Sequence, residues 1–529
     1  MAIPAERLET AFWAVLAVTL AVRLALAVAL PFTSDEAYFY YWGVYPDFGF
    51  YDHPPMIGWL LGAVGSISNA PWALRLPAVL LPAILALAVV WLVREVGAAS
   101  RDREERAWLA GIVFALLPVE VLFALITTDT PLIFFSTLSI LAFAAALRND
   151  RVGLYLLAGV FLGLAFLSKY FAALLGVAYV AFAFVSPARE RRWRGVAITL
   201  AAAVPFGFLN LAWNYGHCWA NMMFNAYNRH EGAKATAKTP LLYLGMLVYV
   251  LSPAVLWWLF RERGWAAGLR ADPQRRFLAT VTGVPFATFA LLSLAKTIGL
   301  HWLLAFAPAF VALAGLLLST RALRASATFL AWFSAIHVLA TAVVLALPIE
   351  AFRSTKWYSG IVMTAAPADF FRALAPYMDE FELAAEGYSP AITMSYNAKR
   401  LGFGPRTPGE PPVPHGYVFV YGLGSSHARH DDILTDFRKL DGRNILVVRK
   451  TPPPADQYAP YFDSVEYQTI DVRGARYYLV LGRGFRLREY RDGILAVVRD
   501  RYYRIPSYLV QGECYFCERY FGTRTCPTR

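Results

Sequence analysis

Long apolar blocks separated by short polar loops fill the first two thirds of this 529-residue chain. A helix needs roughly 20 mostly apolar residues to cross a bilayer. Apolar residues make up 58% of the chain and charged residues only 16%. We therefore expect a polytopic α-helical membrane protein with about 11 transmembrane helices, at 12–32, 72–93, 107–126, 131–147, 152–167, 170–186, 195–213, 240–260, 277–294, 302–319 and 327–348.

Basic residues gather in alternate loops, which predicts the orientation of the spans, because cytoplasmic loops carry the excess of lysine and arginine. One set of loops holds Arg94, Arg101, Arg103, Arg106, Arg148, Arg151, Arg189, Arg191, Arg192, Arg194, Arg261, Arg263, Arg270, Arg275, Arg276, Arg321 and Arg324. The other set holds only Lys169, Arg229, Lys234, Lys238 and Lys296. The N-terminus is then inside and everything after Leu347 outside. The net charge of +12 is largely this topology signal, and we do not expect a nucleic-acid partner.

This orientation brings a set of polar residues to one face of the membrane. Charged groups near a bilayer are costly unless a function requires them. An acidic and aromatic run, 35–42, follows the first span and precedes His53-Pro54-Pro55. All of the following fall on the outer face, which predicts one site there: Asp35, Glu36, His53, Asp129, Lys169, His217, Lys296 and His301.

The character of the sequence changes after the last span. Alternating segments at 417–421, 444–448, 464–472, 476–482 and 494–503 are typical of strands, and 380–401 and 430–440 are typical of helices. We expect a membrane module over 1–349, with its first outer loop at 33–71, and a soluble periplasmic α/β domain over 350–529.

Four cysteines allow several interpretations. Cys218 stands alone, and Cys514, Cys517 and Cys526 cluster near the C-terminus. A C-x-x-C pair is found in metal knuckles and in redox pairs, although a structural zinc site usually has four ligands. On the outer side of the membrane a structural disulfide is equally compatible.

Several short motifs, taken in order, resemble the membrane glycosyltransferases of the GT-C type. Within that type they are most similar to the bacterial protein-mannosyltransferase-like and aminoarabinose-transferase-like group. The motifs are the acidic and aromatic run, Tyr51-Asp52-His53-Pro54-Pro55, Thr128-Asp129-Thr130-Pro131, Leu167-Ser168-Lys169-Tyr170, Trp213-Asn214, the stretch from Lys296 to Trp302, and Gly424-Ser425-Ser426-His427 in the outer domain.

The resemblance implies transfer of a sugar from a polyprenyl-phosphate donor, with inversion, to an acceptor on the outer face of the bacterial inner membrane. Acceptors in this group include lipid A, lipopolysaccharide, other lipids, glycans and protein. The attacking hydroxyl needs a carboxylate as general base. The leaving lipid phosphate needs a cation to meet its developing charge.

Two carboxylates of the first outer loop are candidates for the base. Asp35 takes the position of the group's first-loop acidic residue, and Glu36 is its neighbour. The alternative is helix capping, because Ser34 and Asp35 precede a plausible short helix. Tyr38, in the same run, is placed with the donor-binding residues.

The second acidic residue that the resemblance implies is Asp129, expected to position the acceptor, the base or a metal; the alternative is a helix-start residue ahead of Pro131. Lys169, Lys296 and His301 are the expected donor-phosphate and sugar contacts. Snorkelling of Lys169 and interfacial anchoring of Lys296 beside Trp302 are the alternatives.

His53 departs from the aminoarabinose-transferase pattern, which has lysine before the two prolines, and so puts aminoarabinose as the donor sugar in doubt. A protonated imidazole would still meet a phosphate. Alternatively, His53 binds a divalent cation with Asp35 or Asp129, or it is only a polar turn. No cofactor is required by the residues themselves.

Two other classes of protein share some of these features. Secondary transporters and flippases also carry intramembrane charges, but they place them near the midplane between repeated halves, and this sequence has no such repeat. A non-catalytic envelope assembly protein would not need to retain Asp35, Asp129 and Lys169.

Overall fold

The computed structural model describes residues 5–96, 102–187, 192–228, 236–263, 269, 272–403, 417–423, 429–454 and 456–528. Contacts divide the chain into two compact units. Unit 1 comprises Met1–Leu30, Pro54–Asn210 and Gly232–Leu345, and unit 2 comprises Pro31–His53, Leu211–Glu231 and Ala346–Arg529. Part of the first outer loop thus groups with the C-terminal residues. The motif Gly424-Ser425-Ser426-His427, and Arg101, Arg189, Arg191, Arg229, Lys234 and Arg270, lie outside the described residues.

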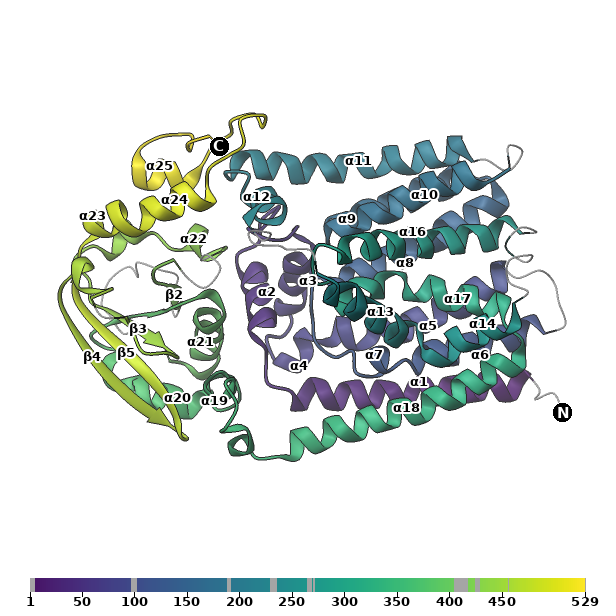
Figure 1. Cartoon of the computed structure of the whole chain (residues 1–529), viewed down its shortest axis with the longest axis horizontal. Coiled ribbons are helices and arrows are strands. Elements are labelled where there is room, and N and C mark those ends of the chain that lie inside the picture. The colour runs from purple at the N-terminus through teal and green to yellow at the C-terminus, as the bar shows by residue number, and fades with distance from the viewer. Residues whose placement is uncertain are drawn as a thin grey trace. The chain divides into compact units, whose positions relative to one another are not determined.

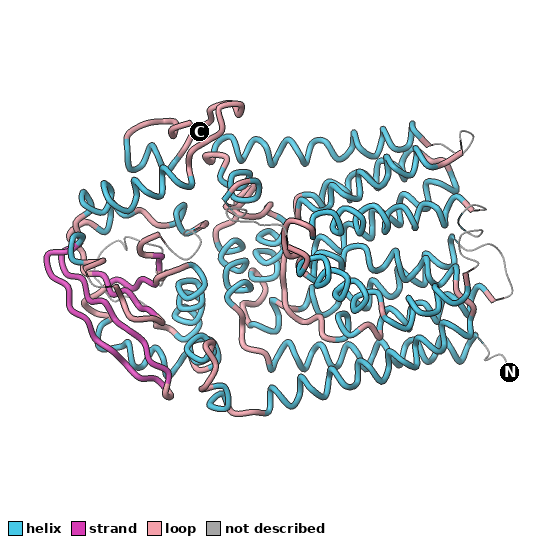
Figure 2. Tube along the Cα trace, in the orientation of Figure 1, coloured by secondary structure: helices cyan, strands magenta, loops and turns pink. Residues whose placement is uncertain are grey.

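Unit 1 consists of helices throughout its described part (Figures 1 and 2). Its elements are α1 (Ala5–Ala29), α3 (Met56–Gly65), α4 (Pro71–Leu74), α5 (Leu76–Val96), α6 (Arg103–Ala115), α7 (Pro118–Val121), α8 (Asp129–Asn149), α9 (Val152–Phe166), η1 (Tyr170–Ala172), α10 (Ala173–Val185), most of α11 (Trp193–Gly216), α13 (Lys238–Leu251), α14 (Pro253–Glu262), α16 (Pro273–Ser293), η4 (Leu300–Phe306), α17 (Ala307–Leu317) and nearly all of α18 (Thr320–Ala346).

Seven helices of the described chain are long and apolar enough to cross a bilayer, and an eighth span results if α13 and α14, bent by 87°, are counted as one. The protein is therefore a multi-pass membrane protein. The blocks expected at 152–167 and 170–186 form shorter apolar helices. The block expected at 107–126 is interrupted, because α6 ends at Ala115 and a new turn begins at Pro118, whose ring cannot donate a helical hydrogen bond.

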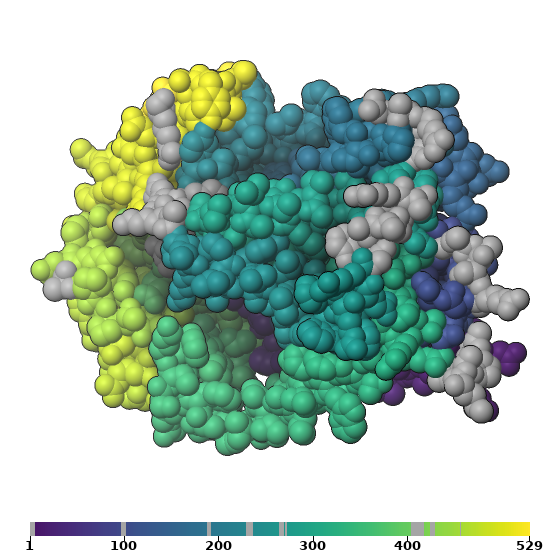
Figure 3. All heavy atoms as spheres, turned by 45° about the vertical axis from the view of Figure 1, so that its right-hand side comes forward, coloured from purple at the N-terminus to yellow at the C-terminus, as the bar shows by residue number. Residues whose placement is uncertain are grey.

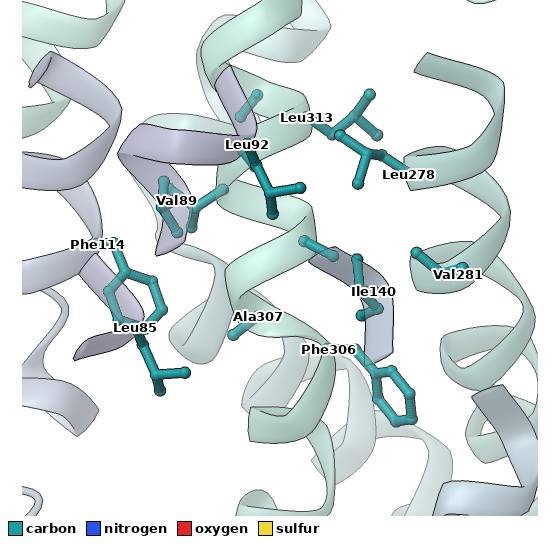
Figure 4. Close-up of a cluster of buried hydrophobic side chains, with 14 of the residues drawn as sticks. Leu85, Val89, Leu92, Phe114, Ile140, Leu278, Val281, Phe306, Ala307 and Leu313 are labelled. Atoms are coloured by element: carbon teal, nitrogen blue, oxygen red, sulfur yellow. The ribbon is translucent and has the colours of Figure 1, made fainter. Parts of the chain in front are cut away.

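The core of unit 1 is a single apolar cluster shared by its central helices. Leu85, Val89 and Leu92 of α5 meet Phe114 of α6, Ile140 of α8 and residues of α16 and α17 (Figure 4). Teal atoms, the colour of the part of the chain that holds α13, α14 and α16, lie in the middle of the face seen in the space-filling view (Figure 3). By contrast, α18 leaves large apolar side chains exposed, with Trp332 at 72%, as expected of a surface that faces lipid.

Ion pairs collect where the arginine-rich loops meet the helices of unit 1. Arg94 contacts Glu104 at 2.7 Å, Arg148 contacts Glu95 at 2.6 Å, and Arg324 pairs with Glu105. These pairs join α5, α6, α8 and α18 at one end of the helices. The basic residues that we used to predict orientation therefore also tie helix ends together.

Unit 2 contains a five-stranded mixed sheet in the order β2-β1-β3-β5-β4. Strands β1 (Glu382–Ala385), β2 (Phe419–Val420) and β3 (Ile445–Arg449) are parallel, and β4 (Phe462–Val472) and β5 (Ala475–Phe485) form an antiparallel hairpin joined to β3 through β5. The other elements are α2 (Ser34–Val44), α12 (Ala220–Ala226), η5 (Ile349–Phe352), α19 (Tyr358–Ala365), α20 (Pro367–Leu374), η6 (Ala375–Tyr377), α21 (Tyr388–Leu401), α22 (Asp431–Leu434), η7 (Phe437–Leu440), η8 (Ala459–Tyr461), α23 (Leu487–Tyr490), η9 (Arg491–Leu495), α24 (Ala496–Tyr502) and α25 (Tyr515–Phe521).

Both faces of the sheet are covered. Leu446 and Val448 of β3 join Leu479 and Leu481 of β5 in the cluster that packs against α19, α20 and α21. On the other face, aromatic rings of β2, η7, β5 and α23 pack against one another in tilted and edge-to-face pairs. Alternate residues of each strand point to opposite faces, so β3 is buried on both sides.

Two secondary-structure predictions for the C-terminal region were wrong. The segment 494–503 is helical, because Leu495, Val498 and Tyr502 are buried while Val497 is 45% exposed, a helical spacing that its apolar run concealed. The expected helix at 380–401 begins only at Tyr388, since Glu382–Ala385 pairs as β1. The strands expected at 417–421, 444–448, 464–472 and 476–482 overlap β2 to β5.

Candidate functional site

The start of α2 is fixed by a capping box. Thr33 is the N-cap residue: its side chain accepts the N–H of Glu36 at 3.3 Å, and the Glu36 carboxylate accepts the N–H of Thr33 at 3.0 Å. Reciprocal bonds of this kind satisfy two backbone donors that the helix leaves unpaired. The expectation that Ser34 or Asp35 caps the helix was therefore wrong. Buried Glu36 has a folding role here, and its part in catalysis stays a prediction.

Asp35 is left in the first turn of α2 with an exposed side chain. Its Oδ1 accepts a hydrogen bond from the Tyr388 hydroxyl at 3.5 Å. A carboxylate that is open to solvent and beside a phenol is accessible to a substrate hydroxyl. Of the two candidate carboxylates of the first outer loop, Asp35 is exposed and Glu36 is buried.

Tyr38, on the next turn of α2, lies in a buried polar chain. Its hydroxyl donates to Asp52 Oδ1 at 3.1 Å and accepts the N–H of His430 at 3.1 Å. Asp52 also meets Arg429 at 3.2 Å, and the Arg429 guanidinium lies 3.8 Å from the centroid of the Tyr388 ring. Burial raises the pKa of Tyr38 well above its usual value, so the hydroxyl remains a donor. The chain ties α2 to the residues that contact Asp35.

Asp52 is buried beside the expected site and carries a perturbed pKa. Burial raises the pKa of its carboxyl, and the charge of Arg429 and the hydrogen bond from Tyr38 oppose that rise. Its backbone is held from α12, where Asn225 donates to the Asp52 carbonyl at 3.0 Å. Asp52 therefore positions the turn that carries His53.

His53 lies against aromatic side chains of α2. Its ring centroid is 6.2 Å from that of Phe39 and 6.0 Å from that of Trp42, and its carbonyl accepts the N–H of Phe50 at 3.0 Å. The imidazole is half-buried. The structure thus places Asp35, Glu36, Tyr38 and His53 in unit 2, on α2 and the turn that follows it. His217 also belongs to unit 2, where its Nε2 lies 3.7 Å from Asp47 Oδ2.

The remaining expected residues come together in unit 1, at the end of α8 opposite Arg148. Lys169 Nζ contacts both carboxylate oxygens of Asp129 at 2.9 Å, and His301 Nε2 lies 3.9 Å from Asp129 Oδ2. The side chains of Asp129 and Lys169 are 4% and 8% exposed, whereas that of His301 is 53% exposed. Three separate segments, α8, the break before η1, and η4, supply the cluster.

An aromatic wall adjoins this cluster. The Trp302 ring packs 4.4 Å from that of Phe171, and Lys296 Nζ lies 5.2 Å from the Trp302 centroid. Because Trp302 is buried, it is not part of an interfacial belt. The buried ion pair of Lys169 likewise rules out snorkelling as the account of that side chain. Asp129 is also the first residue of α8, where the helix dipole favours a carboxylate. It is therefore both a helix-start residue, as the alternative predicted, and a member of the ion pair.

Sequence reasoning missed several residues of this neighbourhood. Asp52 lies inside the motif at 51–55, but only the histidine and the prolines of that motif were interpreted. Arg429 lies 377 residues after Asp52 in the sequence, and Tyr388 is similarly remote. No local sequence pattern marks either residue. Asn225, on α12, is equally unmarked.

The described residues contain one group of three or more side chains spaced to hold a metal, namely Cys514, Cys517 and Cys526. These cysteines form disulfides, Cys218–Cys514 and Cys517–Cys526. Of the interpretations open for the cysteines, the structural disulfide is the one observed, and the C-x-x-C pair is not bonded to itself. Cation binding by His53 stays a prediction.

Part of the sequence is similar to known proteins. Residues 52–213 match the model of a family described as dolichyl-phosphate-mannose-protein mannosyltransferase. The lipid A galacturonosyltransferase RgtD of Rhizobium johnstonii is 32% identical over 192 residues, which are 36% of this chain. The match spans only 40% of that relative's length.

Two solved structures of ArnT from Cupriavidus metallidurans share the fold. The apo structure is 15% identical with a TM-score of 0.57, covering 89% of this chain and 98% of that one. The structure bound to undecaprenyl phosphate is 16% identical with a TM-score of 0.55, covering 88% and 97%. The expected resemblance to GT-C type membrane glycosyltransferases is confirmed.

Proposed function

We propose, for this multi-pass chain with a GT-C fold, the transfer of a sugar from a polyprenyl-phosphate donor to an envelope lipid such as lipid A, with inversion, at the outer face of the inner membrane. The cluster of Lys169 and His301 around Asp129 is the observation that carries the proposal. The names of two similar proteins support it, since one is a lipid A galacturonosyltransferase and the other was solved with undecaprenyl phosphate.

The cluster in unit 1 suits the donor phosphate. As the glycosidic bond breaks, negative charge grows on the leaving phosphate, and fixed cations stabilise it most where water is excluded. Lys169 is buried and held by Asp129, while His301 is exposed and Lys296 half-buried beside it. We assign Lys169 to the fixed charge, and His301 and Lys296 to the contacts that a ligand reaches first. Asp129 orients Lys169.

The exposed carboxylate in unit 2 suits the acceptor. A hydroxyl that attacks the anomeric carbon loses its proton as the new bond forms, and a nearby carboxylate can accept it. Asp35 is exposed. Among the described residues, its carboxylate has one hydrogen bond, from the Tyr388 hydroxyl at 3.5 Å. Glu36 is committed to the capping box. We therefore assign the base to Asp35 and assign Glu36 to holding the start of α2.

The outer location follows from chemistry as well as from the basic loops. Disulfides persist in oxidising compartments such as the periplasm. Cys218–Cys514 joins the loop after α11 to the C-terminal region, and both segments were predicted to be outside. Unit 2 is accordingly proposed as the periplasmic unit.

Reconstitution separates the proposed transferase from the two alternatives. The purified chain in proteoliposomes is given undecaprenyl-phosphate sugars, one at a time, together with lipid A. New glycosylated lipid A, detected by mass, is the expected result. Movement of the donor across the bilayer without a new product would identify a flippase instead. Binding of the donor with neither transfer nor movement would identify a non-catalytic assembly protein.

A further inference from the structure

A cavity of about 550 Å³ lies within unit 2. Its walls come from four segments: 31–34 before and at the start of α2, 356–365 on α19, 386–393 at the start of α21, and 450–451 after β3. No residue expected in the site from sequence lines it. The cavity therefore calls for a separate explanation.

The charge of the cavity is positive. Lys356 and Lys450 line it, and neither ammonium forms an ion pair with a described residue. Glu386 also lines it, but its carboxylate is paired with Arg449 at 3.0 Å and accepts the backbone N–H of Lys450 at 3.2 Å. The charge of Glu386 is thus neutralised by an arginine that does not line the cavity. The two lysines can therefore bind an anion.

The first turn of α21 adds to this charge. Its N-cap, Gly387, offers no side-chain hydrogen bond, and the turn contains no acidic residue. Backbone N–H groups at a helix start lack partners within the helix and carry a partial positive charge. Ser389, in that turn, lines the cavity. Together with the two lysines, this end of α21 favours a phosphate or carboxylate.

The rest of the lining is amphipathic. Hydroxyls of Ser34 and Ser389 line it and suit hydrogen bonds to a polyol, and Trp357 and Ile361 provide apolar surface. The Thr451 hydroxyl, also in the lining, already donates to Glu386 at 3.5 Å. Two of the segments come after candidate membrane helices in the chain: 31–34 directly follows α1, which ends at Ala29, and 356–365 follows α18, which ends at Ala346, after η5. Trp357 is 64% exposed next to Lys356, the pairing of residue types found at membrane interfaces.

We propose that this cavity binds the phosphorylated sugar headgroup of a membrane amphiphile, acting as the subsite that holds the acceptor lipid. The lysines meet the phosphate, the hydroxyls meet the sugar, and Trp357 faces the lipid surface. The assignment to the acceptor rests on the proposed function, whereas binding of a phosphorylated headgroup does not.

Native mass spectrometry of the full chain in detergent tests the proposal with three probes: diphosphoryl lipid A, its dephosphorylated form, and inorganic phosphate. The variant Lys356→Glu/Lys450→Glu should weaken binding of diphosphoryl lipid A about tenfold, because two exposed lysines, each contributing up to about 1 kcal/mol of attraction, become repulsive. The dephosphorylated lipid should bind weakly to every form. Lys439→Glu, an exposed lysine outside the cavity, is the matched control and should bind as the wild type.

Lys356→Arg/Lys450→Arg keeps both charges and should retain binding, which separates loss of charge from loss of folding. Unchanged affinity in the glutamate variant, or no binding of diphosphoryl lipid A to the wild type, would overturn the proposal. Inorganic phosphate binding as tightly as the lipid would overturn the headgroup assignment in favour of a free anion site. Lysine-dependent lipid binding without any sugar transfer would support this inference and refute the proposed function.

Discussion

The pair formed by Lys169 and Asp129 gives the sharpest test of the structure of unit 1. Two contacts of 2.9 Å join side chains that are only 8% and 4% exposed. Removing one member of a buried ion pair leaves an uncompensated charge and costs about 3–5 kcal/mol. Lys169→Met and Asp129→Asn should both lower stability by amounts in this range.

The two single variants should lose similar amounts of stability. After Lys169→Met, the Asp129 carboxylate keeps His301 at 3.9 Å and the start of α8, a helix end worth about 0.3–1 kcal/mol to an anion. After Asp129→Asn, the Lys169 ammonium keeps the face of Phe171 at 5.4 Å, worth about 0.5–1 kcal/mol. These remaining interactions differ little in free energy. Both variants should therefore lose about 3–4 kcal/mol of stability, the lower end of the range for a broken buried ion pair.

The double variant Asp129→Asn/Lys169→Met should be more stable than either single variant, because no charge is left buried. The expected coupling therefore exceeds the loss of a single variant, about 3 kcal/mol. The measurement is thermal unfolding in detergent, followed by size-exclusion fluorescence, with Arg476→Met as the control for an exposed pair of 62% and 58% side-chain exposure. That control should melt as the wild type does.

Activity of the double variant separates a structural pair from a functional one. If Lys169 meets the donor phosphate, the double variant should regain stability but stay without sugar transfer. Single variants that melt like the wild type, or a double variant whose loss equals the sum of the single losses, would refute the buried pair. A stable and fully active double variant would remove Lys169 and Asp129 from the chemistry.

Three further predictions concern unit 2 and topology. Burial lowers the pKa of His430 to about 3 and raises that of Asp431 to about 7. The contribution of His430 to the free energy of unfolding is therefore lost as the pH falls below about 6.5. The contribution of Asp431 is lost as the pH rises from about 4 to about 7. The two pH dependences oppose each other, so each variant should reveal the dependence of the residue that remains. Asp431→Asn should be less stable at about pH 4.5 than at about pH 6.5, and His430→Gln should be more stable at about pH 4.5 than at about pH 6.5, each by about 1.4 kcal/mol per pH unit at most. Equal stability of either variant at the two pH values would contradict the assignment. A cysteine at Tyr508, which is 72% exposed, should react with an impermeant thiol reagent in intact cells and one at Arg103 should not, because the former is proposed to be periplasmic; the reverse labelling would invert the topology. If His53 meets a phosphate as a cation, His53→Lys should keep activity and a chelator should have no effect on the wild type, whereas chelator inhibition reversed by divalent cation would show a metal role.

The membrane part of the fold could be predicted from apolar run length, because bilayer thickness sets that length. The prediction was least accurate where a break interrupts an apolar run, as at Pro118, or where a bend joins two short helices, as at Ser252. Hydropathy measures composition and not direction. It therefore cannot separate one bent span from two helices.

The start of α2 carries a sequence signal that distinguishes its two acidic residues. Thr33-Ser34-Asp35-Glu36 has the spacing of a capping box, yet we interpreted both carboxylates as candidates for chemistry. The structure divides them, with Glu36 in the cap and Asp35 exposed. The four-residue pattern alone is enough to predict that Glu36 belongs to the cap.

The clusters themselves could not be predicted from local pattern. Lys169 lies 40 positions from Asp129, and Arg429 lies 377 positions from Asp52. Ion pairs of this kind depend on helix packing and on the sheet topology, which one sequence does not encode in any short motif. Resemblance to a family pointed to Asp129 and Lys169, but it carried no sign of Asp52, Arg429 or the cavity beside α19.

The most direct test of the proposed transferase is the mass of lipid A after incubation with an undecaprenyl-phosphate sugar and the reconstituted chain, wild type beside Asp35→Asn. The amide keeps the shape of the side chain and loses the proton acceptor. We predict a product one sugar heavier from the wild type, and turnover reduced by at least about a hundredfold in the variant, with donor binding retained. A variant that makes product at the wild-type rate would contradict the assignment of Asp35 as the base, and a wild type that makes none with any donor would contradict the transferase itself.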